Sequence, residues 1–194
     1  MSSTNRDAER QPNDLYETPA ETTLAMLPRL SEWQPNSVLD PCCGSGAILN
    51  ACRTHWPDVE TLGIEIDGAT ADRTIGSPHR VAVGDALSLP WPAVDIAVMN
   101  PPYSLAEQFV RRAYETAWMV VALLPLAFLG SEDGESLIER VGTPDVYLLS
   151  TRQSFTGGTA GPHDSAWMVW DVGGNDGRIR RLKSVCRAAA RKEE

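Results

Sequence analysis

Short apolar segments rich in β-branched residues alternate with helix-like segments along most of this chain. Seven such segments predict strands, at residues 37–40, 62–66, 80–83, 94–99, 118–124, 146–150 and 166–172. Several are apolar on both faces, which is typical of a parallel sheet covered by helices on each side. A glycine-rich connection, residues 151–165, joins the last two strands without a helix, so they can pair antiparallel. The pattern predicts an α/β domain with a seven-stranded, mostly parallel sheet, an antiparallel edge strand and helices on both faces.

Length and composition favour a single globular domain. The 194 residues, 42% of them hydrophobic, are enough to bury a sizeable core. We expect a flexible N-terminus over residues 1–14, a main domain over residues 15–177 and a basic C-terminal tail over residues 178–194. The longest apolar run, residues 117–129, is too short to span a bilayer, and the N-terminus lacks the apolar stretch of a signal peptide. These features predict a cytoplasmic protein without a membrane partner.

The four cysteines stand at positions 42, 43, 52 and 186 and include no C-x-x-C pair. This spacing predicts neither a disulfide framework nor a zinc knuckle. Cys52 and His55 form a C-x-x-H motif, but no second ligand pair accompanies it, and structural zinc needs four ligands. We therefore expect no metal site.

Charge is distributed unevenly along the chain, whose net charge is −9. Residues 178–194 hold seven basic and two acidic side chains, a local balance of +5, so residues 1–177 carry −14. A basic tail on an acidic body can be an arm that contacts phosphates. The alternative is a solvated helix end, because a run of charge by itself specifies little.

A glycine turn follows the first predicted strand, in the sequence Asp40-Pro41-Cys42-Cys43-Gly44-Ser45-Gly46. Gly44 and Gly46 allow the backbone to turn sharply and a ligand to approach closely. Ligands of open α/β sheets bind at the carboxyl ends of the strands, where this turn lies. The turn lacks the Lys-Ser/Thr ending of a phosphate-binding P-loop, so a nucleoside triphosphate is not expected. The alternative to a ligand site is a purely structural turn.

Two more acids follow neighbouring strands. Glu65 ends the second strand, where a carboxylate can accept hydrogen bonds from both ribose hydroxyls, and Asp85 follows the third. Each acid alone could cap a helix, but Asp40, Glu65 and Asp85 at three successive strand ends favour a shared ligand site. Carboxylates repel a pyrophosphate and attract a cationic sulfonium nucleoside that carries an ammonium group. The acids therefore predict S-adenosylmethionine rather than NAD.

The fourth predicted strand ends in Asn100-Pro101-Pro102-Tyr103. Two prolines make a rigid, extended loop, in which the Asn100 side-chain oxygen and the Pro101 carbonyl can accept hydrogen bonds from one planar NH₂ group. Such acceptors favour a pyramidal nitrogen whose lone pair can attack an electrophilic methyl group, without a covalent intermediate. Tyr103 offers a flat face on which a planar substrate can stack. The alternative is a proline-rich turn whose tyrosine belongs to the core.

Together these motifs resemble the amino-methyltransferases of the class I S-adenosylmethionine-dependent, Rossmann-like fold, over about residues 16–172. The order of a T-P motif (Tyr16 to Pro19), the G-x-G turn and N-P-P-Y is similar to the γ arrangement of DNA adenine-N6 methyltransferases, and most similar to small phage-type enzymes. The resemblance implies catalytic roles for Asn100, Pro101, Pro102 and Tyr103. It implies cofactor-binding roles for Tyr16, Thr18, Pro19, Asp40, Pro41, Cys42, Gly44, Gly46, Glu65, Ile66, Asp85, Ala86 and Asn100.

A later stretch, Arg152-Gln153-Ser154-Phe155-Thr156-Gly157, resembles the R-P-S-F-T-G segment of those phage-type enzymes, with Gln153 in place of proline. The resemblance implies substrate-binding roles for Arg152, Ser154 and Phe155 beside Tyr103. It also implies that residues 15–177 are a methyltransferase catalytic domain, in the cytoplasm of a bacterium or a phage-infected host. The activity implied is methyl transfer to the N6 amine of adenine in DNA, by base flipping and direct in-line transfer.

Several other activities share these motifs. An RNA methyltransferase acting on adenine N6 or guanine N2 can share N-P-P-Y, as can a glutamine-N5 methyltransferase of proteins. A cofactor-binding subunit that regulates a partner is a further alternative. A Ser-His-Asp hydrolase is poorly supported, because the sequence has no G-x-S-x-G motif.

Overall fold

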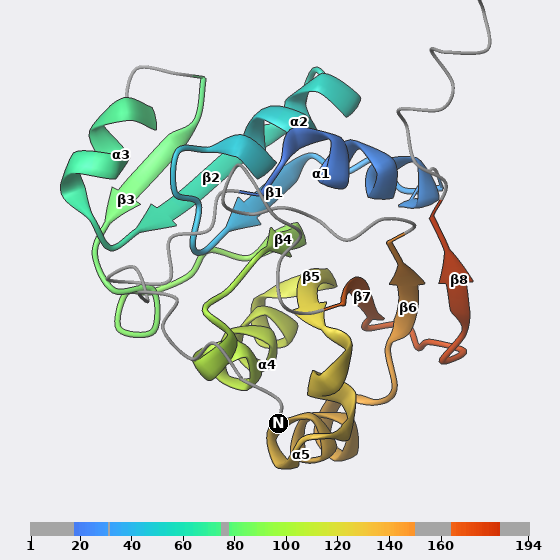
Figure 1. The fold of residues 1–194 in the computed structure, drawn as a ribbon. Helices are drawn as coiled ribbons and strands as arrows, with labels where there is room; N and C mark the ends of the chain where they lie inside the picture. The colour runs from blue at the N-terminus through green and yellow to red at the C-terminus, as the bar shows by residue number, and fades with distance from the viewer. Residues whose placement is uncertain (1–17, 31, 75–77, 150–163, 183–194) are drawn as a thin grey trace, which may run out of the picture.

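The computed structural model describes residues 18–30, 32–74, 78–149 and 164–182 (Figure 1). Its strands are β1 (Ser37–Asp40), β2 (Glu60–Glu65), β3 (Arg80–Val83), β4 (Val94–Met99), β5 (Ala117–Pro125), β6 (Asp145–Leu148), β7 (Ser165–Asp171) and β8 (Ile179–Arg181). They form one sheet in the order β3-β2-β1-β4-β5-β7-β6-β8. Strands β1 to β5 pair in parallel, whereas β7 runs antiparallel to both of its neighbours. The α/β class and the mostly parallel sheet predicted from the sequence are confirmed.

Helices cover both faces of this sheet, as Figure 1 shows. The α-helices are α1 (Ala20–Met26), α2 (Ala47–His55), α3 (Gly68–Thr74), α4 (Ala106–Thr116) and α5 (Glu132–Val141). Short 3₁₀ helices are η2 (Leu27–Leu30), η3 (Tyr103–Leu105) and η4 (Leu126–Gly130). Helices α1 and α2 bury their apolar side chains in one core cluster, and α4 and α5 bury theirs in a second cluster. The sheet therefore separates two cores.

Strand β5 illustrates how one apolar run serves both cores. Met119, Val121 and Leu123 belong to the first cluster, and the alternate residues Val120 and Ala122 belong to the second. Successive side chains of a strand point to opposite faces, so a central strand of a covered sheet must be apolar throughout. This is why the run that includes residues 117–125 forms a buried strand.

Two details of the predicted sheet were wrong. Within the described residues the sheet has eight strands rather than seven, and its antiparallel strand is β7, which lies between β5 and β6 rather than at an edge. Strand β7 is apolar and almost entirely buried, because it pairs with a strand along each edge and its alternate side chains enter the two cores on either face of the sheet. The edge next to β6 is instead occupied by the three-residue β8, which pairs with β6 in parallel.

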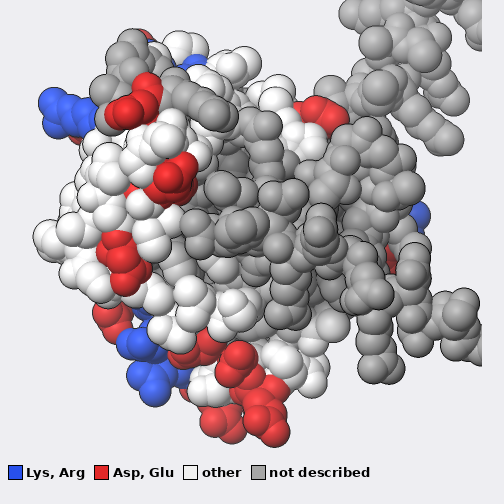
Figure 2. Space-filling model, turned by 60° about the vertical axis from the view of Figure 1, so that its left-hand side comes forward, with Lys and Arg blue, Asp and Glu red and all other residues white. Residues whose placement is uncertain are grey.

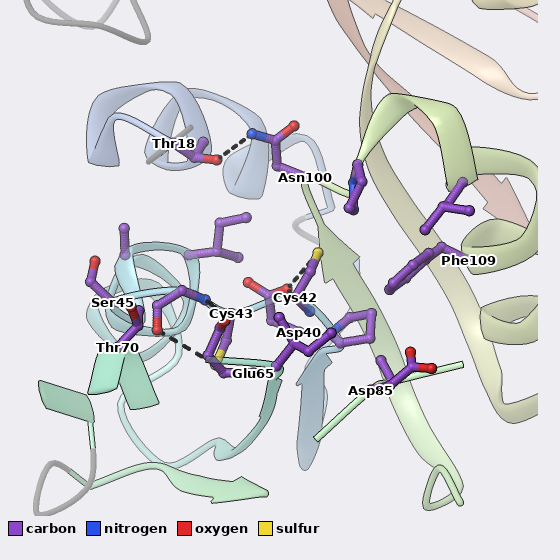
Figure 3. Close-up of a pocket in the computed structure, with 18 of the residues that line it drawn as sticks. Thr18, Asp40, Cys42, Cys43, Ser45, Glu65, Thr70, Asp85, Asn100 and Phe109 are labelled. Carbon is purple, nitrogen blue, oxygen red and sulfur yellow. Dashed lines mark hydrogen bonds between the residues drawn. The ribbon is translucent and has the colours of Figure 1, made fainter. Parts of the chain in front are cut away.

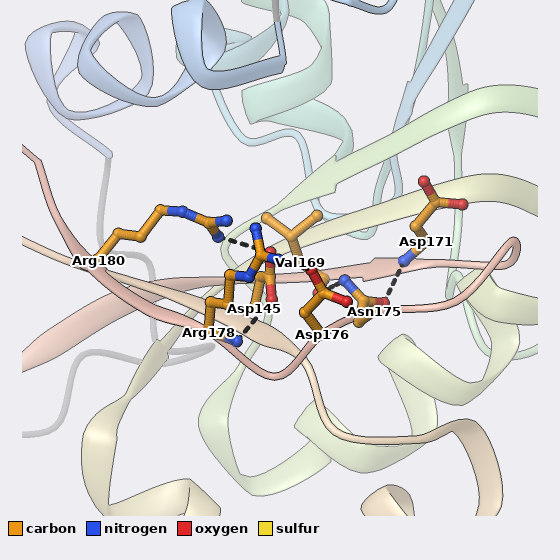
Figure 4. Close-up of polar contacts among 7 residues, drawn as sticks. All are labelled: Asp145, Val169, Asp171, Asn175, Asp176, Arg178 and Arg180. Atoms are coloured by element: carbon orange, nitrogen blue, oxygen red, sulfur yellow. Dashed lines mark hydrogen bonds and ion pairs between the residues drawn. The ribbon is translucent and has the colours of Figure 1, made fainter.

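Strand β8 was not predicted, because its sequence has no alternation of apolar and polar residues. Polar contacts hold it in the sheet instead (Figure 4). The Asp145 carboxylate accepts hydrogen bonds from the backbone N–H of Arg178 at 2.7 Å and from the Arg180 guanidinium at 2.6 Å. The Arg180 guanidinium also lies 5.4 Å from the centre of the Tyr147 ring. The first residues of the predicted basic tail are thus part of the sheet.

Among the residues that the structure describes, no helix is long and apolar enough to cross a membrane. The predicted flexible N-terminus, residues 1–14, lies outside the described residues. The same is true of residues 183–194, the greater part of the predicted tail.

Candidate functional site

The turn between β1 and α2 has the backbone geometry that its glycines predict. Gly44 and Gly46 have φ angles of 51° and 83°, in the left-handed region that favours glycine. The Gly46 N–H donates to the Cys43 carbonyl at 2.8 Å, and Gly46 then precedes the first residue of α2. At Gly44 a Cβ would meet no atom within 4 Å, so the turn leaves open space on this side.

Glu65 at the end of β2 is tied to this turn (Figure 3). One of its carboxylate oxygens accepts a hydrogen bond from the Gly44 N–H at 2.8 Å, and the other accepts from the Asp67 N–H at 2.9 Å. The side chain is buried, with 5% of its surface exposed. Glu65 therefore fixes the turn, and each oxygen still has a second lone pair that can accept another donor.

Asp40 at the end of β1 has a carboxylate oxygen without a partner. Oδ1 accepts a hydrogen bond from the Cys42 N–H at 3.1 Å, whereas Oδ2 is buried and makes no hydrogen bond within the described part of the chain. Burial raises the pKa of Asp40 to about 7, and the nearby charge of Glu65 adds to this effect. A buried, unpaired carboxylate oxygen is costly, so this position favours a cationic or hydrogen-donating ligand.

Asp85 follows β3 and is exposed, in contrast to Asp40. Its carboxylate accepts hydrogen bonds from the Leu87 N–H at 2.9 Å and from the Ser88 hydroxyl at 2.8 Å. These hydrogen bonds hold the pKa of Asp85 below its usual value, so the carboxylate stays ionised. Asp85 thus caps a turn rather than a helix, which was the alternative that the sequence left open, and it also lines the cavity described below.

Asn100 at the end of β4 contacts the beginning of the described chain. Its side-chain Nδ2 donates to the Thr18 hydroxyl oxygen at 3.0 Å, although 82 residues separate the two in sequence (Figure 3). Thr18 is buried just before α1. The contact fixes the orientation of the amide, because the NH₂ end faces Thr18 and the carbonyl oxygen Oδ1 lies on the other side.

These side chains surround one cavity of about 320 Å³, at the carboxyl ends of β1 to β4. Small-molecule sites of α/β folds occupy this position, and their volumes are about 300–1,000 Å³. The cavity is lined by Thr18, Asp40, Pro41, Cys42, Cys43, Gly44, Ser45, Ala47, Ile48, Glu65, Ile66, Thr70, Gly84, Asp85, Ala86, Asn100, Pro102, Leu105 and Phe109.

Most residues predicted to bind the cofactor are in that set, as is Pro102 of the predicted catalytic loop. The described residues from the prediction that do not line the cavity are Pro19, Gly46, Pro101 and Tyr103. Tyr103 is half-buried in η3 and packs against the second core cluster, where the sequence left open a core role. The remaining predicted residues, Tyr16, Arg152, Ser154 and Phe155, lie outside the described residues.

Leu105 and Phe109 form an apolar wall of the cavity that was not predicted from the sequence. Both lie just after the N-P-P-Y loop, four residues apart, and Phe109 is on the buried side of α4. That i, i+4 spacing was visible in the sequence, but only the structure shows that this side of α4 reaches the cavity.

Comparisons with known proteins support a methyltransferase fold, although no protein-family model matches the chain. A curated relative is the Type II methyltransferase M.CvrRI of Paramecium bursaria Chlorella virus XZ-6E, which is 28% identical over 99 residues. The match covers 49% of this chain and 26% of the relative, so the chain aligns with about a quarter of that protein.

Three solved structures share the fold. A candidate RNA methyltransferase from Pyrococcus horikoshii has a TM-score of 0.62 and 19% identity, with 80% of this chain and 86% of that one covered. The modification subunit of a candidate type I restriction enzyme from Vibrio vulnificus gives 0.63 and 14%, with 92% and 53% covered. A TehB-like SAM-dependent methyltransferase from Corynebacterium glutamicum gives 0.54 and 17%, with 80% and 88% covered. The Rossmann-like methyltransferase fold expected from the sequence is thereby confirmed.

Proposed function

We propose that the chain transfers a methyl group from S-adenosylmethionine to the exocyclic N6 amine of adenine in DNA. The observation that carries this proposal is the position of Asn100, whose amide is held by Thr18 on the wall of a cavity that three carboxylates also line. Two of the similar proteins have names from restriction–modification systems, a type II methyltransferase and a type I modification subunit. Those names support DNA as the substrate.

The residues around the cavity fit the cofactor. The buried Asp40 Oδ2 suits the ammonium group of the methionine moiety, because a cation there would replace the missing hydrogen bond. Glu65 keeps lone pairs for ribose hydroxyls, and the ionised Asp85 can accept a hydrogen bond from an adenine amine. The open space at Gly44 leaves room for backbone approach. When bound, S-adenosylmethionine supplies an electrophilic methyl group on a positively charged sulfur.

Asn100 then acts on the amine of the substrate. Since its NH₂ end donates to Thr18, its oxygen is the end that can accept a hydrogen from an incoming amine. An acceptor aimed at an amine hydrogen stabilises the positive charge that develops on nitrogen as its lone pair attacks. No covalent intermediate on the protein is needed, because the N–C bond forms as the S–C bond of the sulfonium breaks and the sulfur leaves as a neutral thioether. The excess proton then passes from the nitrogen to water. A base within a duplex cannot reach this cavity, so we infer that the target adenine is flipped out.

DNA has to approach an acidic protein. On the face shown in Figure 2, acidic side chains are spread over the described surface, while basic ones are few. Within the predicted tail, Arg178 and Arg180 form ion pairs with Asp176 and Asp145 at 2.5 and 2.6 Å, so part of their charge is already compensated (Figure 4). We infer that phosphate contacts come from Arg181, which is exposed, and from the basic residues after it in sequence.

The decisive experiment supplies labelled cofactor together with DNA, RNA and protein pools, followed by mass spectrometry of nucleosides and amino acids. N6-methyladenine in DNA is the expected product. Methylated RNA, methylglutamine or N4-methylcytosine as the sole product would replace the proposal with the corresponding alternative. Cofactor binding without transfer to any pool would favour the regulatory subunit.

Asn100→Ala tests the residue that carries the proposal. Turnover is expected to fall by about 10²–10³, as for loss of one preorganised polar contact to the reacting group. Melting temperature and affinity for S-adenosylhomocysteine should change little. Asn36→Ala is the matched control, because Asn36 is exposed and precedes β1, at the opposite end of that strand from the cavity. Normal turnover in a folded Asn100→Ala variant would contradict the catalytic role and would show that the N-P-P-Y loop is only a structural turn.

Salt dependence tests the tail. Replacing Arg181, Lys183 and Arg187 with Gln is expected to weaken DNA binding about equally for all sequences. It should also lower the slope of log affinity against log salt by close to one unit per lost phosphate contact. Arg178 and Arg180 are left intact because their ion pairs stabilise the sheet edge. An unchanged slope would assign the tail to structure alone.

A further inference from the structure

We propose that Arg112 is a positioning residue that holds the nucleobase wall of the cavity and thereby sets its preference for an adenine ring. This inference rests on the proposed function, since it concerns the same cofactor. Arg112 lies on α4, outside every motif identified in the sequence and outside the set of cavity-lining residues. Its guanidinium donates hydrogen bonds to the carbonyl oxygens of Ala86, at 3.0 Å, and of Leu87 and Leu89.

The segment that receives these hydrogen bonds has no helix or strand of its own. It joins β3 to β4, so its carbonyl groups lack the partners that regular secondary structure would provide. A planar guanidinium carries five N–H donors in a fixed arrangement, which suits several converging carbonyls. Without Arg112, these half-buried carbonyls would turn toward other donors, and the segment would change its path.

Trp91 completes the arrangement. Its indole N–H donates to the Ala86 carbonyl at 2.7 Å, so this oxygen accepts from both Trp91 and Arg112. The Arg112 guanidinium carbon lies 5.2 Å from the centre of the Trp91 ring, within the range of a cation–π contact. The Trp91 ring in turn packs against Phe109, with centroids 6.2 Å apart. The segment is therefore held against α4 by both polar and aromatic contacts.

The same contacts position the cavity wall. Three residues of this segment line the cavity, namely Gly84, Asp85 and Ala86. They come just before Leu87 and Leu89, whose carbonyl oxygens Arg112 also binds. Phe109 also lines the cavity and lies on α4, one helical turn before Arg112. Figure 3 shows Asp85 and Phe109 among the residues that line the cavity. By binding the segment that follows Asp85, Arg112 fixes the position of its carboxylate relative to the apolar surface of Phe109. A planar ring that binds there must fit both, with a hydrogen-donating group facing Asp85.

Arg111, the neighbouring residue, provides a matched control. Its guanidinium forms ion pairs with the half-buried Glu107 at 3.3 Å and with the exposed Glu115 at 3.7 Å, both on α4 itself. Pairs of this kind contribute little to stability. Arg111→Met therefore removes the same charge and the same side-chain shape from the same helix, without touching the segment after β3.

The test compares two ligands that differ only in the base. Binding of S-adenosylhomocysteine and of S-inosylhomocysteine, in which an oxygen replaces the N6 amine, is measured by calorimetry with the full chain. The wild type is expected to prefer the adenosyl ligand by at least about tenfold, because Asp85 accepts from the amine and repels the carbonyl oxygen. Arg112→Met should weaken adenosyl binding about tenfold and bring the ratio of the two affinities close to one. Arg111→Met should leave both affinities within about twofold.

Two further variants keep the inference falsifiable if Arg112→Met does not fold. Arg112→Lys retains the charge but reaches fewer carbonyls, and Trp91→Phe retains a ring but loses the N–H to Ala86. Both are expected to give intermediate ratios. A ratio that stays at the wild-type value in these folded variants, or a wild type that does not discriminate, would overturn the inference. Absence of any adenosyl binding by the wild type would instead contradict the proposed function.

Discussion

Asp40 is expected to cost the protein stability at neutral pH when no ligand is bound. Its pKa of about 7 in the folded chain contrasts with 3.8 in an unfolded one, and burial is the main cause. At a pH between these two pKa values, Asp40 holds a proton in the folded state that it has lost in the unfolded chain. The free energy of unfolding therefore falls as the pH rises, and Asp40→Asn, which cannot ionise, removes this fall.

The size of the effect follows from the two pKa values. For the wild type, the loss of unfolding free energy due to Asp40 is about 2 kcal/mol at pH 5 and about 4 kcal/mol at pH 8. The stability difference between Asp40→Asn and the wild type should thus widen by about 2–3 kcal/mol between these pH values. At about 2–4 °C per kcal/mol for a domain of this size, the difference in melting temperature should widen by about 5–10 °C.

The assay is thermal unfolding of both proteins at pH 5 and pH 8 without cofactor. Comparing the two differences cancels any constant effect of the amide on packing. Asp58→Asn is the control, because it makes the same replacement at an exposed position outside the cavity. Asp40→Asn should also weaken binding of S-adenosylhomocysteine, since a neutral amide cannot pair with an ammonium group. A difference that stays constant or narrows toward pH 8 would refute the reasoning.

Two further predictions concern the scaffold. Gly134→Ala should destabilise the fold by several kcal/mol or prevent folding, because a Cβ at this position would lie 1.9 Å from the Phe128 carbonyl oxygen. Gly130→Ala, where a Cβ would meet nothing within 4 Å, should be close to neutral in denaturant unfolding, and equal effects would contradict this contrast. Burial, and to a lesser extent Arg53, lowers the pKa of His79. As the pH drops, the unfolded chain therefore takes up a proton at this histidine before the folded chain does. The free energy of unfolding should fall below a pH of about 6.5. His79→Gln should flatten this part of a stability–pH curve, and an unchanged curve would assign the fall to other groups.

Much of the fold followed from local patterns. The seven predicted strands are all present, because strands of a covered parallel sheet are short apolar runs that can be recognised one at a time. Strand β8 was missed because its residues, Ile179 to Arg181, are held by Asp145 and Tyr147, which lie more than thirty positions earlier. The interior position of β7 was missed for a related reason, since strand order depends on which strands pair along their edges, and β7 pairs with both β5 and β6.

The sequence by itself determined which chemical groups this protein can bring to a site. The glycine turn, the three acids after the first three strands and the Asn100 loop all lie at strand ends, and parallel strands place their carboxyl ends at one edge. Only the tertiary structure decided how each group behaves there. Asp40 and Asp85 are chemically identical, yet burial raises the pKa of the former to about 7, whereas hydrogen bonds from Leu87 and Ser88 lower that of the exposed Asp85. Desolvation and long-range contacts such as those of Thr18 and Arg112 depend on neighbours brought together by folding, and no local pattern in the sequence contains them.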